Sequence, residues 1–205
     1  MSSQIATQNK QPVIQCDSVY KIFGENAKKM LESSQGNVDA KTFQDAGCVV
    51  GVNNASFEVH NGDLLVVMGL SGSGKSTLLR CISRLTDATS GKIFIDGEDL
   101  LALSNKKLIE LRRNKMGMVF QSFALLPHKT VLENIAFPLQ IKGNSTQDSI
   151  KRAKDMVDLV GLDGREIISQ ENYRVVSSSV SASLALWLLS LIFGFWTSLF
   201  QHSIH

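Results

Sequence analysis

Cysteine is scarce in this chain of 205 residues, and neither sign of charge is in clear excess. The three cysteines, Cys16, Cys48 and Cys81, lie far apart and fit no metal-ligand spacing, and their odd number suits a reducing compartment. The net charge is only +2, with basic and acidic residues interspersed, so the composition gives no reason to expect nucleic-acid binding. The polar residues 1–12 lack the apolar segment of a signal peptide.

Charged side chains are absent from residues 175–204, whereas the chain before about residue 171 is mixed and charged. Within this tail, the apolar residues 181–200 are long enough for a transmembrane helix, because about 20 residues span roughly 30 Å. The segment follows a serine-rich stretch and has only Arg174 as a basic flank, so a membrane span is not the interpretation that we prefer.

Local patterns predict an alternation of strands and helices. Strands are predicted at residues 13–19, 55–69 (two strands joined at Asn61-Gly62), 91–97 and 116–120. Helical segments are predicted at residues 76–85, 105–114, 126–139 and 145–162, with an insert of residues 25–48 read as a helix-containing segment or loop. The continuous apolar run at 64–68 predicts a strand buried on both faces.

A phosphate-binding loop is the strongest motif. Gly69-x4-Gly74-Lys75-Ser76 fits the Walker A pattern, with a predicted buried strand before it and a predicted helix after it. Glycines allow successive N–H groups to converge on phosphate oxygens, the lysine supplies a point charge, and the serine hydroxyl can ligate Mg²⁺. The expected nucleotide contacts are Gly69, Leu70, Ser71, Gly72, Ser73, Gly74, Lys75, Ser76 and Thr77.

A wider resemblance covers about residues 12–166. The segments GLSGSGKSTLLRCISRL, GKIFIDGEDL, LRRNKMGMVFQSFALLPHKTVLENIAFPL and DLVGLDGRE resemble, in order and spacing, the ATP-binding subunits of ABC transporters. VYKIFGENAKKMLE, followed by an insert, and VFQSFALLPH are similar to the branch that imports glycine betaine, proline and related quaternary amines. The Walker A part is shared by many nucleotide-binding proteins, whereas the context of Gln121 is specific to ABC proteins.

The resemblance implies roles for individual residues. Gln121 matches the glutamine that contacts Mg²⁺ and couples the site to the membrane subunit, although it could simply cap a strand end. Phe23 matches the aromatic residue that stacks on adenine, and the alternative is a core aromatic. Residues 123–128 match the surface that docks the transmembrane partner, but His128 is not the family's catalytic histidine, which would lie much further along the chain.

The family's remaining catalytic motifs are missing. No LSGGQ-type motif is present, no apolar strand after Gln121 ends in an Asp-Glu pair, and no carboxylate follows Glu171. The resemblance makes these carboxylates responsible for holding Mg²⁺ and activating water. We therefore expect at most weak nucleotide binding and no turnover.

Codon degeneracy suggests why the tail diverges. If each true codon began at the third base of a written codon, the tail would permit ELSGGxQQRVGLARALA and later LLDEPFSALDP. Because Trp has a single codon, Phe195-Trp196 must then give Leu and Trp196-Thr197 must give Asp, where the family has its magnesium carboxylate. We interpret the tail as an out-of-frame reading after one nucleotide lost near residues 166–170. A sequencing error and a pseudogene are both compatible with this interpretation.

The sequence predicts an α/β protein with an incomplete ABC-type nucleotide-binding domain at residues 1–166 and a divergent tail at 167–205. It has an antiparallel β part, a Walker A core in a mostly parallel sheet, and the start of a helical subdomain at 127–165. Because the predicted core sheet lacks one of its central strands, we expect the folded chain to be only marginally stable.

The family implies ATP and Mg²⁺ as cofactors and a homodimer of nucleotide-binding subunits. It also implies transmembrane permease subunits, a substrate-binding protein, and a peripheral position on the cytoplasmic face of the membrane. Two alternatives remain open: a membrane-anchored nucleotide-binding regulatory module, and an ABC ATPase for another substrate such as an amino acid.

Overall fold

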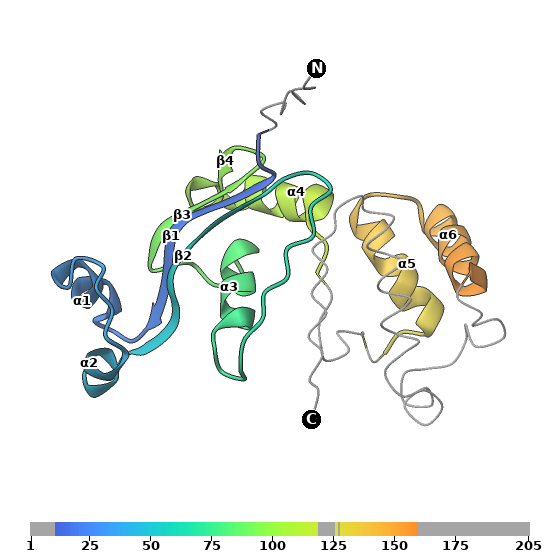
Figure 1. Ribbon diagram of the computed structural model, residues 1–205. Helices are drawn as coiled ribbons and strands as arrows, with labels where there is room; N and C mark the ends of the chain where they lie inside the picture. Colours follow the sequence, from blue (N-terminus) through green and yellow to red (C-terminus); the bar gives the residue numbers. More distant parts are fainter. Residues whose placement is uncertain (1–10, 119–125, 127, 160–205) are drawn as a thin grey trace, which may run out of the picture. The chain divides into compact units, whose positions relative to one another are not determined.

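The computed structural model describes residues 11–118, 126 and 128–159. The chain divides into two compact units, one up to Leu108 and one from Ile109 (Figure 1). The elements are β1 (Ile14–Phe23), α1 (Ala27–Ser33), α2 (Ala40–Asp45), β2 (Val49–Val59), α3 (Lys75–Ile82), β3 (Ser90–Ile95), β4 (Glu98–Asp99), the 3-10 helix η1 (Leu100–Ala102), α4 (Asn105–Lys115), α5 (Val131–Ile141) and α6 (Thr146–Leu159).

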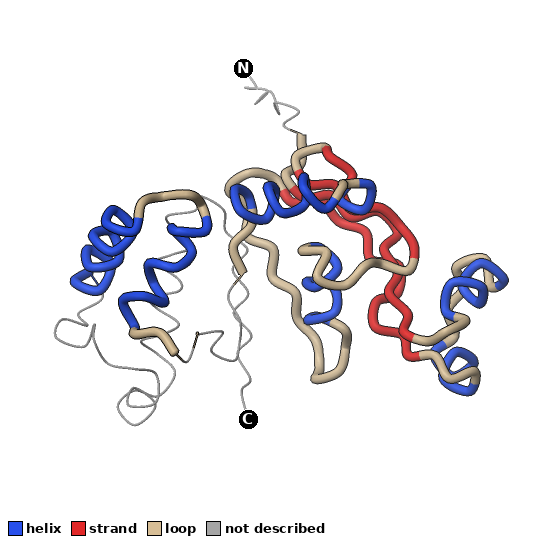
Figure 2. The backbone as a smooth tube through the Cα atoms, turned by 180° about the vertical axis from the view of Figure 1, so that it is seen from behind, coloured by secondary structure: helices blue, strands red, loops and turns tan. Residues whose placement is uncertain are grey.

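An antiparallel sheet lies in the first unit, with strand order β2-β1-β3-β4. Figure 2 shows its strands in red. The central strand β1 pairs with both long neighbours, so that Ile14 lies opposite Val59 on β2 and Ile95 on β3. Ile93 is directed into the core by the alternating burial of β3, and Val19 on β1 follows an irregularity in the strand pairing; both side chains are fully buried. The strands predicted at 13–19 and 91–97 are confirmed, and β1 continues to Phe23.

The insert at residues 25–48 contains two short helices, α1 and α2, beside the Phe23 end of β1 (Figure 1). Asp39 caps α2, because its side chain accepts the Thr42 N–H at 2.9 Å. The two helices close a small core of their own, formed by Tyr20, Ile22, Ala27, Leu31, Phe43 and Cys48. The predicted helix-containing insert is therefore confirmed.

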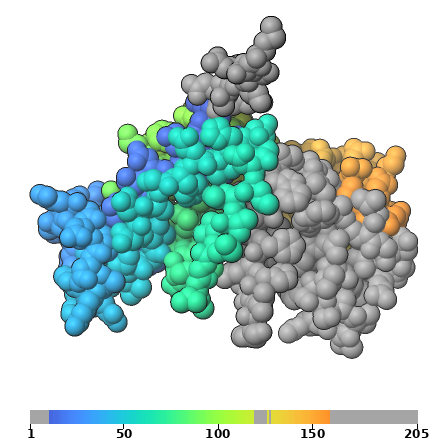
Figure 3. All heavy atoms as spheres, in the orientation of Figure 1, coloured from blue at the N-terminus to red at the C-terminus, as the bar shows by residue number. Residues whose placement is uncertain are grey.

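The strand predicted at 64–68 is wrong: the turn at Asn61-Gly62 forms, but an extended segment without a strand follows it. Its apolar side chains lie largely in solvent, with Leu64 67% and Met68 85% exposed (Figure 3). A strand buried on both faces needs neighbours on both sides, and no described strand lies beside this segment.

The sheet within the described residues is therefore antiparallel, rather than part of the mostly parallel core that the sequence predicted. Residues 116–118 of the strand predicted at 116–120 are also irregular, and residues 119–120 lie outside the described residues. The strand predicted at 64–68 and the described part of the strand predicted at 116–120 both belong to the predicted parallel core, whereas the predicted antiparallel part is present.

Helix α3 follows the glycine-rich loop and contacts β1 and β2. Leu78 and Cys81, one turn apart, are its buried residues, so one face of the helix packs on the sheet while the other is exposed. The helix predicted at 76–85 is confirmed with a shorter end, because Arg84 takes a left-handed φ of +52°. The helix predicted at 105–114 is present as α4.

Helices α5 and α6 pack against each other in the second unit. Their shared core consists of Ile135, Ala136, Ala153, Met156 and Val157, bordered by Val131, Leu132 and Ile150. The apolar face predicted for residues 145–162 is confirmed at its described positions, while Val160 and the predicted cap Gly161 lie outside the described residues.

None of the helices in the described ranges is both long and apolar enough to cross a membrane. The apolar segment 181–200, which raised the question of a membrane span, lies outside those ranges.

Candidate nucleotide-binding site

The glycine-rich loop turns tightly before α3. Gly72 and Gly74 have left-handed φ angles of +80° and +88°, which glycine adopts without steric cost. The Ser73 N–H donates to the Leu70 carbonyl at 3.2 Å and closes the turn. The sequence therefore supplies glycine where the chain reverses and a serine where the turn is closed.

The end of the loop lies directly against strand β2. A Cβ at Gly74 would lie 1.9 Å from the carbonyl oxygen of Gly51, a distance that no side chain can occupy. Gly51 is itself confined, since a Cβ there would lie 3.0 Å from the Phe23 ring and 3.0 Å from the Thr77 methyl group. Two glycines from distant parts of the chain thus allow the loop, the strand and the start of α3 to meet.

Lys75 reaches back over the loop. Its ammonium donates to the carbonyl oxygens of Gly69 at 2.8 Å and Leu70 at 2.7 Å, and to the Ser73 hydroxyl at 3.2 Å. These contacts match the three donors of an ammonium group, so a phosphate must displace at least one of them. The exchange is favourable because a hydrogen bond between two charged groups is stronger than one to a neutral carbonyl.

The first turn of α3 adds further groups that attract an anion. The first N–H groups of a helix have no partner within the helix, and the helix dipole places positive potential at the same end. Ser76 is exposed in this turn, and Thr77 directs its methyl group toward Gly51. The loop and the helix start therefore form one continuous set of donors.

Phe23 lies at the end of β1 beside this loop. Its ring is 45% exposed, and the Lys21 ammonium lies 4.9 Å from the ring centroid. Because Gly51 borders both the ring and Thr77, the aromatic face and the start of α3 lie on the same side of the sheet unit. This exposure does not fit the alternative of a core aromatic residue.

These residues fit a nucleoside triphosphate: the exposed Phe23 and the end of the glycine loop both border Gly51, and the Lys75 ammonium lies over the same loop. The described residues contain no group of three or more His, Cys, Asp or Glu side chains that could hold a metal ion. Mg²⁺ prefers oxygen ligands and commonly keeps phosphate oxygens among them. The residues therefore fit Mg²⁺ only as part of a metal–nucleotide complex, with the Ser76 hydroxyl as a protein ligand.

Gln121 and Phe123 lie outside the described residues, so their expected roles remain predictions. Of the expected docking segment, Leu126 and His128 are described. The Asn134 side chain on α5 fixes this segment: its Oδ1 accepts the Leu126 N–H at 2.8 Å, and its amide donates to the Thr130 carbonyl at 2.9 Å. We did not predict this residue, because a polar side chain in a helix gives no sign of the loop that it binds.

The cysteines belong to the core and not to the site. All three are free and buried. Burial raises the pKa of the Cys16 thiol to about 12, and the neighbouring Cys81 adds to the rise. Burial also raises the pKa of Cys81, against the opposing charge of Lys21. Thiols held neutral are poor nucleophiles and poor metal ligands.

Comparison with known proteins gives consistent matches. The family described as "ABC transporter" matches residues 52–187. The trimethylamine N-oxide transport system ATP-binding protein TmoW of Pelagibacter ubique (strain HTCC1062) is 83% identical over 155 residues, covering 76% of this chain and 46% of the relative. The glycine betaine transport ATP-binding protein OpuAA of Bacillus subtilis (strain 168) is 45% identical over 154 residues, which cover 75% of this chain and 37% of the relative.

A solved structure also matches: the dimeric ATP-binding cassette MJ0796 in a post-hydrolysis state with ADP and Pi. It has a TM-score of 0.65 and 25% identity, covering 87% of this chain and 70% of the matched chain. The present chain spans less than half the length of the two curated relatives.

Proposed function

Because this chain belongs to the ABC transporter family of ATPases, we propose that it is the nucleotide-binding front part of an ATP-binding subunit that energises uptake of a small methylated amine. The proposed cargo class is that of glycine betaine and trimethylamine N-oxide. It is supported by 83% identity to TmoW of Pelagibacter ubique and 45% identity to OpuAA of Bacillus subtilis.

The site around Gly51 carries the proposal of nucleotide binding. In it, residues 69–77 bind the phosphates, with Lys75 donating to phosphate oxygens and Ser76 contributing an oxygen to Mg²⁺. Phe23 stacks on the adenine, and Gln121 approaches Mg²⁺ from the segment after α4. Bound nucleotide with Mg²⁺ supplies a phosphoryl group that can be transferred to water.

The proposed partners are those of the whole family protein. Two nucleotide-binding subunits pair, as in the dimeric structure of the matched cassette, and dock on transmembrane permease subunits at the cytoplasmic face of the membrane. A substrate-binding protein delivers the cargo. The segment around Leu126 and His128, held by Asn134, is the proposed contact with the permease.

We propose that this chain binds ATP but does not hydrolyse it. The reason is that no apolar strand after Gln121 ends in an Asp-Glu pair. A fluorescent ATP analogue should bind the purified chain and be displaced by ATP, whereas Lys75→Ala should reduce the affinity at least tenfold. Phosphate release should equal that of the Lys75→Ala control. Release above that control would contradict the proposed inactivity, and equal analogue binding by both proteins would contradict the site.

Residues 167–205 are proposed to be an out-of-frame reading of the remaining half of the subunit. The charge-free composition of residues 175–204 and the forced Leu and Asp codons at 195–197 support this interpretation. Sequencing the DNA around codons 160–175 tests it directly. A neighbouring frame that fails to encode the glycine-pair and acidic-pair motifs would overturn the proposal for the tail and leave the nucleotide site unaffected.

A further inference from the structure

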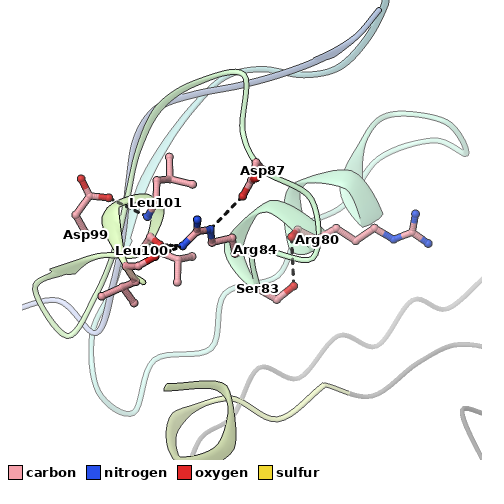
Figure 4. Close-up of polar contacts among 8 residues, drawn as sticks. Arg80, Ser83, Arg84, Asp87, Asp99, Leu100 and Leu101 are labelled. Atoms are coloured by element: carbon pink, nitrogen blue, oxygen red, sulfur yellow. Dashed lines mark hydrogen bonds and ion pairs between the residues drawn. The ribbon is translucent and has the colours of Figure 1, made fainter. Parts of the chain in front are cut away.

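Arg84 links the far end of the nucleotide-binding helix to the sheet unit (Figure 4). Its Nη1 donates to two backbone carbonyls, that of Leu100 at 3.0 Å and that of Leu103 at 2.8 Å. Its Nε donates to the Asp87 carboxylate at 3.1 Å. The Arg84 side chain is only 17% exposed and its two carbonyl contacts are partly buried, whereas the Asp87 side chain is 72% exposed. One guanidinium group thus holds both ends of η1 and the loop after α3.

The backbone at Arg84 is adapted to this contact. Its φ of +52° is uncommon for a residue with a branched or long side chain and usually persists only where surrounding contacts fix it. The Arg84 N–H donates to the Cys81 carbonyl at 2.9 Å, and the Thr86 N–H donates to the Arg80 carbonyl at 3.1 Å. These bonds end α3 and direct the Arg84 side chain toward η1.

The target of Arg84 is itself fixed to the sheet. Leu100 is fully buried, and the Asp99 carboxylate accepts the Leu101 N–H at 3.0 Å (Figure 4). Strand β4 directly precedes η1 and pairs with β3, which pairs with β1. Because β1 ends at Phe23, an unbroken series of contacts joins Arg84 to the aromatic ring at the site.

Other contacts also fix the position of α3. At its start, the loop meets β2 through Gly74 and Gly51. The segment 64–70, which leads into the loop, belongs to none of the described strands and is largely exposed. In the loop after α3, the Thr89 N–H donates to the Tyr20 carbonyl at 2.7 Å, and its hydroxyl donates to the Ile22 carbonyl at 3.1 Å. The orientation of α3 on the sheet therefore depends on the Gly51 contact at one end, the packed face of the helix, and Arg84 together with the Thr89 loop at the other end.

We propose that Arg84 is a positioning residue, which holds α3, the helix that follows the phosphate-binding loop, at a fixed position relative to Phe23 on β1, where the base is proposed to stack. This inference rests on the proposed nucleotide binding. Arg84 touches no part of the nucleotide. Its contribution is to keep the separation of Phe23 and the loop suited to a ligand that occupies both.

The test compares two ligands that share the phosphates and differ in the base. Isothermal titration calorimetry with excess Mg²⁺ measures the affinity of the full chain for ATP and for inorganic tripolyphosphate. In the unchanged chain we expect ATP to bind about tenfold more tightly, which is typical of stacking on an aromatic side chain. In Arg84→Ala this advantage should fall to near unity, while the affinity for tripolyphosphate stays within about twofold of the original.

Matched variants separate positioning from loss of fold. Arg80→Ala removes an exposed arginine from the last turn of the same helix and should preserve the ratio of the two affinities. Arg84→Lys keeps the charge but lacks the planar guanidinium, whose Nη1 and Nε reach the two carbonyls and Asp87 at once. It should therefore lower the ratio with an unchanged circular dichroism spectrum. In a Phe23→Ala chain the ratio should already be near unity, and adding Arg84→Ala should not change it further.

Several outcomes would overturn the inference. Arg84→Lys with the original ratio, or with equal losses for both ligands, would make Arg84 a structural residue only. If Arg84→Ala does not fold, Arg84→Lys alone decides the question. If the unchanged chain binds neither ligand, the proposed nucleotide binding fails, and the positioning role fails with it.

Discussion

Gly74 is where the phosphate loop meets the sheet, and a single methyl group there tests the geometry of the site. In Gly74→Ala the Cβ would lie 1.9 Å from the Gly51 oxygen, on a backbone whose φ is +88°. We expect the free energy of unfolding to fall by about 2–4 kcal/mol and nucleotide binding to be lost. Urea unfolding followed by circular dichroism measures the first effect.

Gly62→Ala is the matched control for that substitution. Gly62 has nearly the same φ, +90°, but a Cβ there would meet nothing within 4 Å. Gly62→Ala should lower the free energy of unfolding only by the cost of a left-handed backbone at a residue with a side chain, about 1–2 kcal/mol. If both variants unfold at the same urea concentration, backbone strain and not contact with Gly51 explains the glycine at position 74.

Because Cys16 is buried, the stability of the sheet unit should vary with pH in the alkaline range. Its pKa is about 12 in the folded chain, against an ordinary value of 9.0, so above pH 9 the unfolded chain loses a proton that the folded chain keeps. Stability should therefore fall as pH rises from about 9 toward 12, by up to about 1.4 kcal/mol per pH unit for one proton. Urea unfolding at several pH values measures the slope.

Cys16→Ala provides the comparison, since every other titrating group stays in place. Its unfolding free energy should decline less steeply between pH 9 and pH 12, although the cavity lowers the starting value. Parallel curves for the two chains would show that another group is responsible.

The sequence identified some residues of the site and missed others for a physical reason. Lys75 and the loop glycines were found because the motif lies in one short segment with a fixed spacing. Gly51 and Arg84 were missed because their roles depend on contacts with residues far along the chain, Gly74 and Leu103 respectively. The adenine contact of Phe23 and the role of Gln121 stay predictions.

At the scale of elements, α5 begins with a complete capping box. The Thr130 hydroxyl accepts the Glu133 N–H at 3.2 Å, and the Glu133 carboxylate accepts the Thr130 N–H at 2.8 Å. The Thr130 N–H and, to a lesser extent, the Thr130 hydroxyl donate to the carboxylate and lower the pKa of Glu133. Thr130→Ala should reduce the stability of the α5–α6 unit by about 1 kcal/mol, measured by thermal unfolding at 222 nm.

Thr130→Ser keeps the hydroxyl and should unfold within a few degrees of the original chain. The lowered pKa of Glu133 means that its contribution is present above the carboxylate's ordinary pKa and is lost as pH falls through the folded value. The difference between Thr130→Ala and the original chain should therefore shrink in acid. A constant difference between pH 3 and pH 7 would rule out a contribution from the bond between the Thr130 hydroxyl and the carboxylate.

Helices were predicted better than the strands of the parallel core. The apolar spacing of α3 and α6 is a property of the segment itself, and both helices formed near the predicted bounds. The strand at 64–68 was not formed, because a strand buried on both faces is a property of its neighbours as much as of its own sequence. The antiparallel pairs of β1 involve only segments inside residues 14–95, and the predicted antiparallel part is confirmed.

At the scale of the whole molecule, the ABC-type fold predicted from the sequence is confirmed by the family match and by the TM-score of 0.65 to a solved cassette. The division at residue 166 and the origin of the tail stay predictions. Within the described ranges, the exposed apolar segment 64–68 is the feature most directly connected with the expected marginal stability.

Leu64→Lys tests that connection. Leu64 is 67% exposed, so a charge there should change the free energy of unfolding by less than about 0.5 kcal/mol while reducing aggregation, measured by light scattering at rising temperature. Val52→Lys, at a buried position on β2, should instead destabilise the fold severely. Unchanged scattering by Leu64→Lys would show that the segment does not drive association.

The contact between Gly51 and Gly74 has a consequence for the order in which the protein is made. Strands β1 and β2 leave the ribosome before the loop, so the surface that the loop must fit can pair first. The carbonyls that receive Arg84 emerge only afterwards. A nascent chain ending shortly after α3 would therefore hold a shaped loop on a helix that is not yet fixed at its far end.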